Sequence, residues 1–227
     1  MTDTLADTTV LVTSGPTRAD IDAVRYIGNR SSGRLGCRIA TEALGRGASV
    51  ILVAGPGSVV PTDLKPEQRG RLRVEPVVTV DDLLQTLKGI LTDGTPPDAV
   101  VHAMAVLDYV PADTAARKTP SGREEWQLTL VPTPKVIRRI REWAPDTLLV
   151  QFKLEVGITE DELRQAALES LRKNRADLVV ANDLTRIRDE VHPALIIDPE
   201  GEVLARPGTK GEIARSVCDV IERRLRE

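Results

Sequence analysis

The sequence predicts an α/β fold with a mostly parallel β-sheet covered by helices on both faces. Short strand-like runs such as residues 49–53 (Ser-Val-Ile-Leu-Val) are nearly continuously apolar, which is typical of a parallel sheet buried on both sides. These runs alternate with segments whose apolar residues recur at helical spacing, as in repeated β-α-β units. No linker or repeat divides the chain, so we expect a single Rossmann-like domain over residues 1–227.

The expected elements follow from this alternation. In chain order, the expected strands are Val10–Thr13, Ser49–Val53, Leu72–Val77, Ala99–Ala103, Thr147–Phe152, Leu178–Ala181 and Ala194–Ile197. The expected helices, each with an apolar face, are Arg34–Arg46, Val80–Leu91, Pro134–Trp143, Glu160–Asn174 and Lys210–Arg224. Residues 56–70 are polar and rich in proline, which predicts a mobile loop.

One segment interrupts the alternation of strands and helices. Residues 118–125 form a polar stretch with proline, serine and glycine, and residues 126–131 alternate as a strand with one exposed face does. We therefore expect a flap or arm near residues 118–131 in addition to the sheet.

Composition argues against several classes of protein. The net charge of −3 at pH 7 argues against binding to nucleic acid or to a membrane surface. The sequence contains neither an apolar run long enough to span a membrane nor the features of a signal peptide, so we expect a cytoplasmic protein. Cys37 and Cys218 lie far apart in helical segments and are expected to be free thiols. The two histidines and two cysteines lack the spacing of zinc ligands.

The most informative stretch joins the first strand to the first helix. It contains Gly15 and residues 29–34 (Asn-Arg-Ser-Ser-Gly-Arg). Backbone N–H groups and the positive end of the helix dipole favour an anion at such a place, and small residues let it approach closely. Arg30 and Arg34 add guanidinium groups that pair with phosphate or carboxylate. The alternative is an ordinary helix cap, and the loop matches neither the phosphate-loop nor the dinucleotide fingerprint.

Further candidate residues follow other strands or begin a helix. They are Ala105 and Asp108, Pro134, Phe152 and Lys153, and Asn182 and Asp183. Each group alone is a weak signal, because Asp and Asn at strand ends often only cap turns. Because the carboxyl ends of parallel strands meet at one edge of a sheet, the groups together predict a binding site at that edge.

These motifs together resemble the phosphopantothenate–cysteine ligase family, also called phosphopantothenoylcysteine synthetase. The matching segments are residues 15–18 (Gly-Pro-Thr-Arg), 24–27 (Val-Arg-Tyr-Ile), 29–36 (Asn-Arg-Ser-Ser-Gly-Arg-Leu-Gly), 105–109 (Ala-Val-Leu-Asp-Tyr), 152–155 (Phe-Lys-Leu-Glu) and 181–183 (Ala-Asn-Asp). The resemblance covers nearly the whole chain. It is greatest to the stand-alone bacterial form, in which no flavin-dependent decarboxylase precedes the ligase.

The resemblance implies a reaction of coenzyme A biosynthesis. Members of the family join L-cysteine to 4′-phosphopantothenate: a nucleoside triphosphate activates the carboxylate as an acyl nucleotide, and the cysteine amine then displaces the nucleotide. The stand-alone form uses CTP, so the resemblance implies CTP in preference to ATP, together with Mg²⁺ and a homodimer. Residues 143–145 (Trp-Ala-Pro) are similar to the eukaryotic form that uses ATP, which leaves ATP open. No metal ligand is predicted.

The resemblance also assigns residues to roles. Asn29 matches the residue that contacts the activated carboxyl group, and Lys118 matches the flap lysine, where the family usually has several lysines. Two lysines of the fused form fall on Ser170 and Asn174, so Lys153 or Lys173 is expected to replace a phosphate contact. The expected nucleotide-binding residues are Gly15, Ser32, Gly33, Ala105, Asp108, Pro134, Phe152, Lys153, Lys173 and Asn174. The expected substrate-binding residues are Arg30, Arg34, Asn182 and Asp183.

Two other functions are compatible with the fold. An NAD(P)-dependent oxidoreductase has the same architecture, but no glycine-rich dinucleotide fingerprint follows the first strand, and neither Tyr26 nor Tyr109 has a lysine four residues later. A non-catalytic relative that binds a nucleotide is the other alternative, because the expected flap contains so few lysines. The fold alone does not decide among the three.

Overall fold

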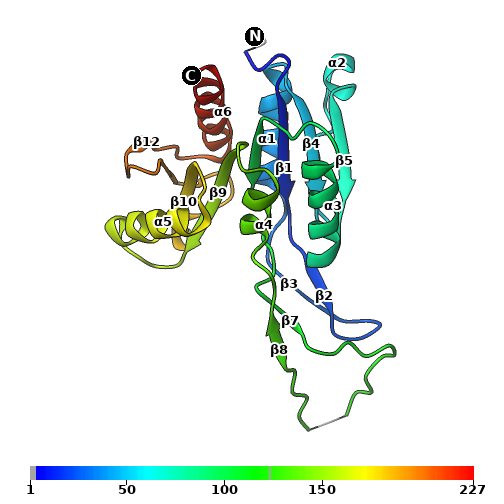
Figure 1. Cartoon of the computed structure of the whole chain (residues 1–227). Helices are drawn as coiled ribbons and strands as arrows, with labels where there is room; N and C mark the ends of the chain where they lie inside the picture. The colour runs from blue at the N-terminus through cyan, green and yellow to red at the C-terminus, as the bar shows by residue number, and fades with distance from the viewer. Residues whose placement is uncertain (1–3, 123) are drawn as a thin grey trace.

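A computed structural model describes residues 4–122 and 124–227, so residues 1–3 and Arg123 of the expected flap lie outside the described chain (Figure 1). Its centre is an eight-stranded sheet with the order β12-β11-β10-β9-β6-β1-β4-β5. The strands are β1 (Thr9–Ser14), β4 (Ser49–Ala54), β5 (Leu72–Pro76), β6 (Ala99–His102), β9 (Leu148–Glu155), β10 (Leu178–Asp183), β11 (Leu195–Ile197) and β12 (Val203–Ala205). From β10 to β5 all neighbours pair in parallel, while β11 and β12 pair antiparallel. The predicted fold class is confirmed.

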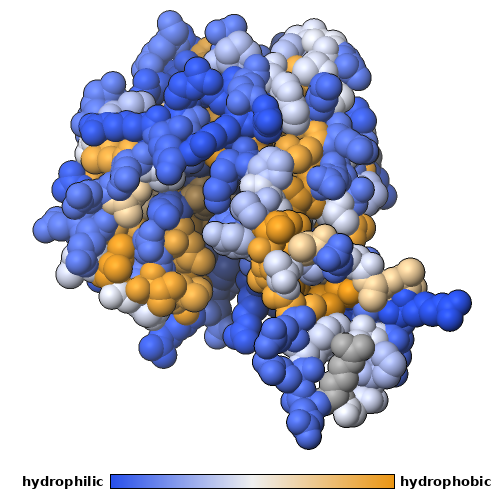
Figure 2. Space-filling view, turned by 60° about the horizontal axis from the view of Figure 1, so that its bottom comes forward, coloured by the Kyte–Doolittle hydropathy of each residue, from blue (hydrophilic) through white to orange (hydrophobic). Residues whose placement is uncertain are grey.

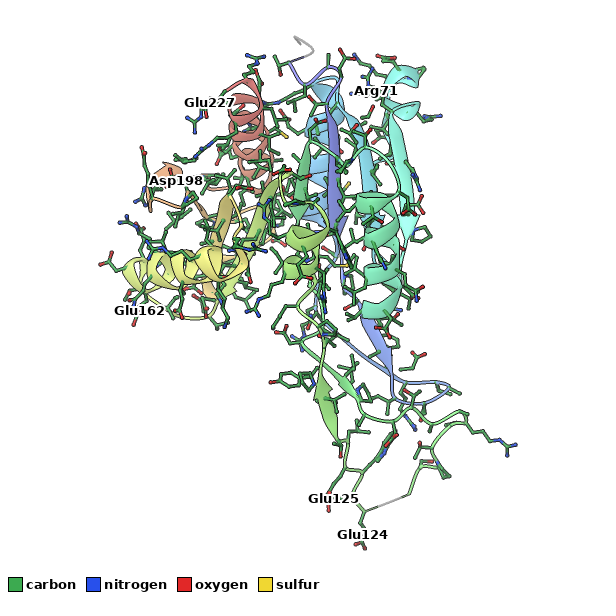
Figure 3. All side chains as sticks on the ribbon, viewed as in Figure 1. Arg71, Glu124, Glu125, Glu162, Asp198 and Glu227 are labelled. Carbon is green, nitrogen blue, oxygen red and sulfur yellow. The ribbon has the colours of Figure 1, made fainter. Side chains whose placement is uncertain are left out.

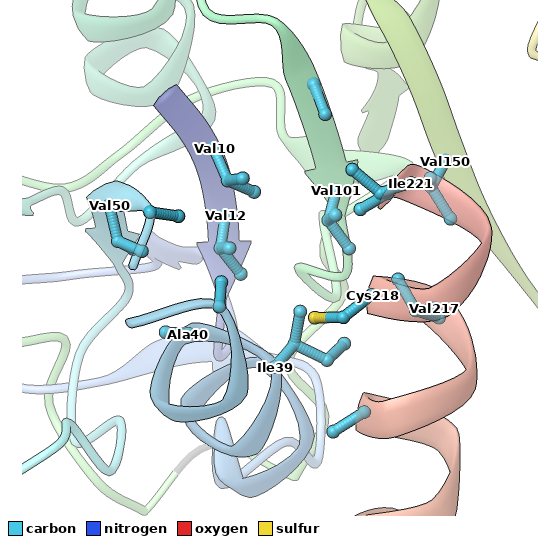
Figure 4. Packing of buried hydrophobic residues seen from close by; sticks show 14 of the residues in the cluster. Val10, Val12, Ile39, Ala40, Val50, Val101, Val150, Val217, Cys218 and Ile221 are labelled. Atoms are coloured by element: carbon cyan, nitrogen blue, oxygen red, sulfur yellow. The ribbon is translucent and has the colours of Figure 1, made fainter. Parts of the chain in front are cut away.

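Helices cover both faces of this sheet. α1 (Arg34–Gly45) and α6 (Lys210–Arg226) lie on one face, and α3 (Val80–Thr92), α4 (Val136–Trp143) and α5 (Glu160–Asn174) lie on the other (Figure 1). Each of these helices lies where the sequence pattern places one. Alternate residues of a strand point to opposite faces, so Val10 and Val12 of β1 belong to the core under α1 and α6, and Leu11 belongs to the other core (Figure 4).

Three local features differ from the expectation. The short helix α2 (Pro66–Arg69) interrupts the predicted loop at residues 56–70, because proline begins a helical turn and the Gln68 side chain accepts a hydrogen bond from the Lys65 N–H at 3.0 Å. Strand β12 was not predicted. A 3₁₀ turn, η1 (Leu184–Arg186), follows β10. Within the described residues, no helix combines the length and apolar character needed to cross a membrane.

An arm extends from the carboxyl edge of the sheet (Figure 1). It consists of two antiparallel pairs, β2 (Arg18–Asp20) with β3 (Tyr26–Gly28), and β7 (Tyr109–Pro111) with β8 (Leu130–Pro132). The expected strand at residues 126–131 was therefore wrong in extent, since β8 begins only at Leu130. Prolines at the ends of β7 and β8 have no N–H to donate, which keeps this ladder short.

The buried carboxylate of Asp22 ties the two parts of the arm together. It accepts hydrogen bonds from the backbone N–H groups of Val24, Arg25 and Thr119, at 2.8, 2.9 and 3.0 Å, and from the Arg25 guanidinium group at 2.5 Å. Burial opposes the charge, but these donors outweigh it and hold the pKa of Asp22 well below its usual value. The Arg25 guanidinium carbon also lies 5.0 Å from the centre of the Trp126 ring.

A second buried charge fixes the opposite edge of the sheet. The Arg141 guanidinium group donates to the carbonyl oxygens of Pro145, Thr147 and Arg175, and to the Asp177 carboxylate at 2.5 Å. These contacts join α4 to the segments that begin β9 and β10. An arginine satisfies several carbonyl groups at once because its donors form a rigid fork.

Glycines let the end of β1, the end of β4 and the start of α1 meet. A Cβ atom at Gly36 would lie 2.3 Å from the Ser14 Oγ atom, and one at Gly55 would lie 1.9 Å from the Pro16 carbonyl oxygen. The Ser14 hydroxyl donates to the Gly33 carbonyl at 2.9 Å, which fixes the start of α1 against β1. Glycine backbone packed against the small Ser14 side chain therefore forms this part of the carboxyl edge.

Two glycines of α1 allow this constraint to be tested. Helix propensity alone predicts that Gly→Ala stabilises a helix by up to about 1 kcal/mol. Gly36→Ala should instead lower the free energy of unfolding by about 1–3 kcal/mol, because the new methyl group overlaps Ser14. Gly45→Ala is the matched control, since the nearest atom to its Cβ is 4.0 Å away. Urea unfolding measures both, and equal stabilisation by the two variants would contradict the close packing at Gly36.

Candidate functional site

The candidate site is a pocket of about 500 Å³ at the carboxyl ends of β6 and β9, between α4 and α5. Its floor is formed by the His102 and Gln151 side chains of the two strands, while Phe152 lines the pocket from β9 and packs its side chain into the core on the other face of the sheet. The predicted nucleotide-binding residues in its lining are Asp108, Pro134, Phe152, Lys153, Lys173 and Asn174. Their common location agrees with the rule that ligands of open α/β sheets bind beyond the carboxyl ends of the strands.

Polar side chains form a row across the floor of the pocket. His102 lies opposite Thr13 on one neighbouring strand and opposite Gln151 on the other. Its Nδ1 atom is 2.8 Å from the Thr13 hydroxyl, which also accepts the Met104 N–H at 3.3 Å. The Asn174 amide donates to Gln151 Oε1 at 2.8 Å. Burial lowers the pKa of His102 to about 4, so its ring is neutral near pH 7.

Charged side chains surround this floor. Lys135 pairs with Asp108 at 2.6 Å, and Lys153 pairs with Glu155 at 2.8 Å. Lys173 also lines the pocket and is exposed to solvent. A neutral, partly apolar floor with lysines around it can accept a flat polar group together with a polyanion.

The glycine-containing loops form a second cluster beside the pocket. The Ala105 N–H donates to the Gly15 carbonyl at 2.8 Å, and the Val59 N–H donates to the Ser32 carbonyl at 3.0 Å. The Asn29 side-chain amide donates to the carbonyl oxygens of Ala105 and Val106, at 3.1 and 3.0 Å. Val106 also lines the pocket, so Asn29 joins the loop cluster to the pocket wall.

The start of α1 differs from the starts of three other helices. Thr79, Thr159 and Thr209 cap α3, α5 and α6 with side-chain hydrogen bonds and complete capping boxes. The residue before α1, Gly33, has a φ of 70° and makes no side-chain cap. The ordinary cap formed by a serine, considered as an alternative from the sequence, is therefore absent at Gly33, and the first N–H groups of α1 are available to an anion.

Several predicted residues lie outside the pocket lining. Asn182 is buried and its side-chain amide lies 3.1 Å from the His192 ring. Asp183 is also buried and accepts the N–H groups of Gly157 and Thr185 at 2.9 Å. These contacts lower the pKa of Asp183 and close the turn after β10, as Asp at a strand end often does.

The predicted cations of the loop and flap are also separate from the pocket lining. Arg34 lines another hollow, together with Cys37 and Arg38. Arg30 is exposed on the loop before α1, and Lys118 is exposed on the arm. Their assigned roles in catalysis and substrate binding therefore stay predictions.

Among the lining residues that were not assigned a role from the sequence, three are polar side chains of the floor and its border. They are His102 and Gln151 on the floor and Lys135 at the start of α4. The parallel register explains why the first two meet, since His102 and Gln151 are paired positions of β6 and β9. His102 ends the otherwise apolar strand β6, and Gln151 follows three apolar residues of β9, which is the signal that was available in the sequence.

Comparison with known proteins gives the family. Residues 5–225 match the model of the DNA/pantothenate metabolism flavoprotein C-terminal domain. The chain belongs to this family. A curated member, the coenzyme A biosynthesis bifunctional protein CoaBC of Thermococcus kodakarensis, is 39% identical over 216 residues, which are 95% of this chain and 51% of the relative. The chain thus spans about half the length of that relative.

Solved structures of the family have the same fold. The DNA/pantothenate metabolism flavoprotein from Streptococcus pneumoniae superposes with a TM-score of 0.85 at 33% identity, covering 96% of this chain and 99% of that one. The C-terminal domain of a CoaBC protein superposes with a TM-score of 0.76 at 29% identity, covering 99% of both chains.

The two histidines predict how stability depends on pH. Burial lowers the pKa of His102 and of His192 to about 4, with Lys210 adding to the shift at His192. An unfolded histidine titrates near pH 6.5, so between about pH 6.5 and 4 the unfolded chain binds protons that the folded chain does not. The free energy of unfolding should therefore be highest above about pH 6.5 and fall as the pH is lowered through this window.

Urea unfolding at several pH values measures this slope. The matched control is the double variant His102→Gln/His192→Gln, which should lose most of the slope in the same window. The hydrogen-bonded carboxylates do not interfere above about pH 5, because their contribution is lost only on further acidification. A stability that stays constant from pH 7 to pH 4.5 would contradict the neutral state of the two rings in the folded chain.

Proposed function

We propose that this chain is a phosphopantothenate–cysteine ligase that joins L-cysteine to 4′-phosphopantothenate through an acyl nucleotide. The main support for the proposal is that two candidate binding sites lie together at the carboxyl edge of the sheet. One is a pocket with a neutral floor and lysines around it, and the other is an uncapped helix start beside it. The family and its CoaBC members support the same activity.

The proposed reaction has two steps. A carboxylate oxygen of phosphopantothenate attacks the α-phosphorus of the nucleotide, and pyrophosphate leaves. The cysteine amine then attacks the acyl carbon, forms the amide bond, loses a proton and expels the nucleoside monophosphate. Both steps move negative charge between phosphoryl and carboxyl groups, so fixed donors and cations near the reacting atoms would lower the barriers.

The nucleotide is proposed to occupy the pocket, with its base toward Phe152 and its phosphates toward the lysines and the start of α1. We propose CTP in preference to ATP, because the motifs at residues 152–155 and 170–183 resemble CTP-using relatives and small residues border the site. Mg²⁺ would arrive with the nucleotide. Mg²⁺ needs only one or two carboxylates when phosphates supply other ligands, and Asp108, Glu155 and Glu169 line the pocket.

A homodimer is proposed from the surface of the arm. The arm exposes large apolar side chains, which include Tyr26, Tyr109, Trp126, Leu128, Leu130 and Val131. Figure 2 shows orange, apolar surface near the base of the arm. Exposed apolar groups on neighbouring antiparallel pairs are typical of an interface. Glu124 and Glu125 lie at the tip of the arm (Figure 3).

Pyrophosphate release tests the proposed activity. With phosphopantothenate and Mg²⁺, release should need a nucleoside triphosphate, and cysteine should be needed for turnover beyond the acyl nucleotide. Specificity constants measured side by side for CTP and ATP test the nucleotide preference. Binding of a nucleotide without any pyrophosphate release would favour the non-catalytic alternative, and binding of nicotinamide dinucleotide would favour the oxidoreductase.

Asn29→Asp should reduce turnover far more than stability. The exchange places a carboxylate oxygen about 3 Å from the carbonyl oxygens of Ala105 and Val106, where the amide now donates. It also adds a negative charge where we propose that the substrate carboxylate is activated. Loss of one donor of this kind typically lowers the rate by about 10²–10³-fold. Steady-state kinetics and thermal unfolding check both expectations, and ligation near the original rate by the folded variant would remove Asn29 from the site.

Lys118→Gln should slow product formation without weakening nucleotide binding. Lys118 is exposed on the arm and away from both cores, so its charge is free to act on a bound substrate. Lys118→Arg is the matched control, since it keeps the positive charge and should retain more activity. Single-turnover kinetics and direct nucleotide titration separate the two steps. Full activity of Lys118→Gln would mean that the assignment of the flap lysine is wrong.

A further inference from the structure

His102 occupies the floor of the pocket, but nothing in the proposed reaction requires a histidine there. Its ring lies between Thr13 on β1 and Gln151 on β9, and it borders the pocket with Met104, Val106 and Phe152. Only one of its two nitrogens, Nδ1, has a hydrogen-bond partner among the described residues. The protonation of the other nitrogen, Nε2, therefore determines whether the ring acts as a hydrogen-bond donor or acceptor toward a ligand.

The partners of Thr13 determine which nitrogen carries the proton. Thr13 is fully buried, and its hydroxyl oxygen accepts the Met104 N–H. Among contacts of the described residues, Nδ1 of His102 is the only acceptor within reach of the hydroxyl proton. If Nδ1 carried the proton instead, that buried hydroxyl would donate to nothing, which is costly. Thr13 therefore donates to Nδ1, and the neutral ring carries its proton on Nε2.

We propose that His102 presents its Nε2–H to the pocket and donates a hydrogen bond to an acceptor atom on the base of the bound nucleotide. This inference rests on the proposed function, because it assumes that the pocket holds a nucleotide. It assigns His102 as a residue that contacts the nucleotide and helps determine its specificity.

The surroundings favour the base over the phosphates as the partner of His102. Met104 and Val106 place apolar groups beside the ring, and these suit a flat heterocycle better than a polyanion. The cations that suit phosphates lie on other elements: Lys135 directly before α4, Lys153 two residues after Gln151 on β9, and Lys173 on α5. The Gln151 and Asn174 amides next to His102 complete a polar floor that can read the edge of a base.

The protonated nitrogen can be identified directly. The chain has two histidines, so a ¹⁵N spectrum of protein labelled at histidine contains two imidazole rings, and the spectrum of His102→Asn assigns them. At pH 7 we expect His102 to show a protonated Nε2 and an unprotonated Nδ1, and CTP should shift the Nε2 signal. A ring protonated on Nδ1, or on both nitrogens, would overturn the inference.

A matched pair of variants tests the contact with the base. The amide of His102→Asn reaches only as far as Nδ1, so it keeps a partner for Thr13 and removes the inward donor. His102→Gln places an amide N–H near the position of Nε2. We expect the KM for CTP to rise about 3–10-fold in His102→Asn and to recover in His102→Gln, with kcat and the KM for phosphopantothenate little changed in both.

The outcomes separate this inference from the proposed function. An unchanged KM for CTP in His102→Asn, with pyrophosphate release intact, would overturn the contact and leave the ligase assignment standing. CTP binding that shifts the Nε2 signal without any pyrophosphate release would support the contact and contradict the ligase. Absence of binding by CTP and ATP to the unmodified protein would overturn both. If His102→Asn does not fold, the spectrum of the unmodified protein decides the result.

Discussion

The close packing of backbone at the end of β1 is the constraint on which the site depends. A side chain at Gly36 or Gly55 would overlap Ser14 or Pro16, so the loops after β1 and β4 and the first turn of α1 can meet only because these two positions carry no side chain. The same meeting leaves Gly15 and Ala105 joined by a backbone hydrogen bond and brings Asn29 against the loop after β6. The uncapped helix start and the pocket wall thereby share one rigid support.

The two halves of the site, the start of α1 and the pocket, are built from different chemical groups. The half around α1 is made of backbone groups and has little side-chain chemistry, as suits an anion held by N–H groups. The pocket half is made of side chains from β6, β9, α4 and α5, fixed in turn by buried contacts such as the Arg141 fork. Asn29 is bonded to both halves, so a movement of the loop before α1 would be transmitted to the pocket wall.

The pattern of apolar runs predicted the fold well, because burial on both faces of a sheet leaves a clear signal in sequence. It also placed Phe152 and Lys153 at one edge, whereas Asn174 came from the family resemblance. It could not predict that the Asn182 side chain contacts the His192 ring or that the Asp183 carboxylate accepts the Gly157 N–H. Such partners come from other parts of the chain or depend on the geometry of a turn. His102 was missed for a related reason: its role depends on the register of β6 between β1 and β9.

The core beneath α1 and α6 contains residues from both ends of the described chain. Val10 and Val12 of β1 pack in one cluster with Val217 and Ile221 of α6 (Figure 4). During synthesis, β1, α1 and β4 emerge long before α6, so the part of this core that α6 covers stays exposed until α6 is made. Stable folding of this half therefore requires α6, and until α6 forms, the exposed apolar surface of the growing chain is open to aggregation.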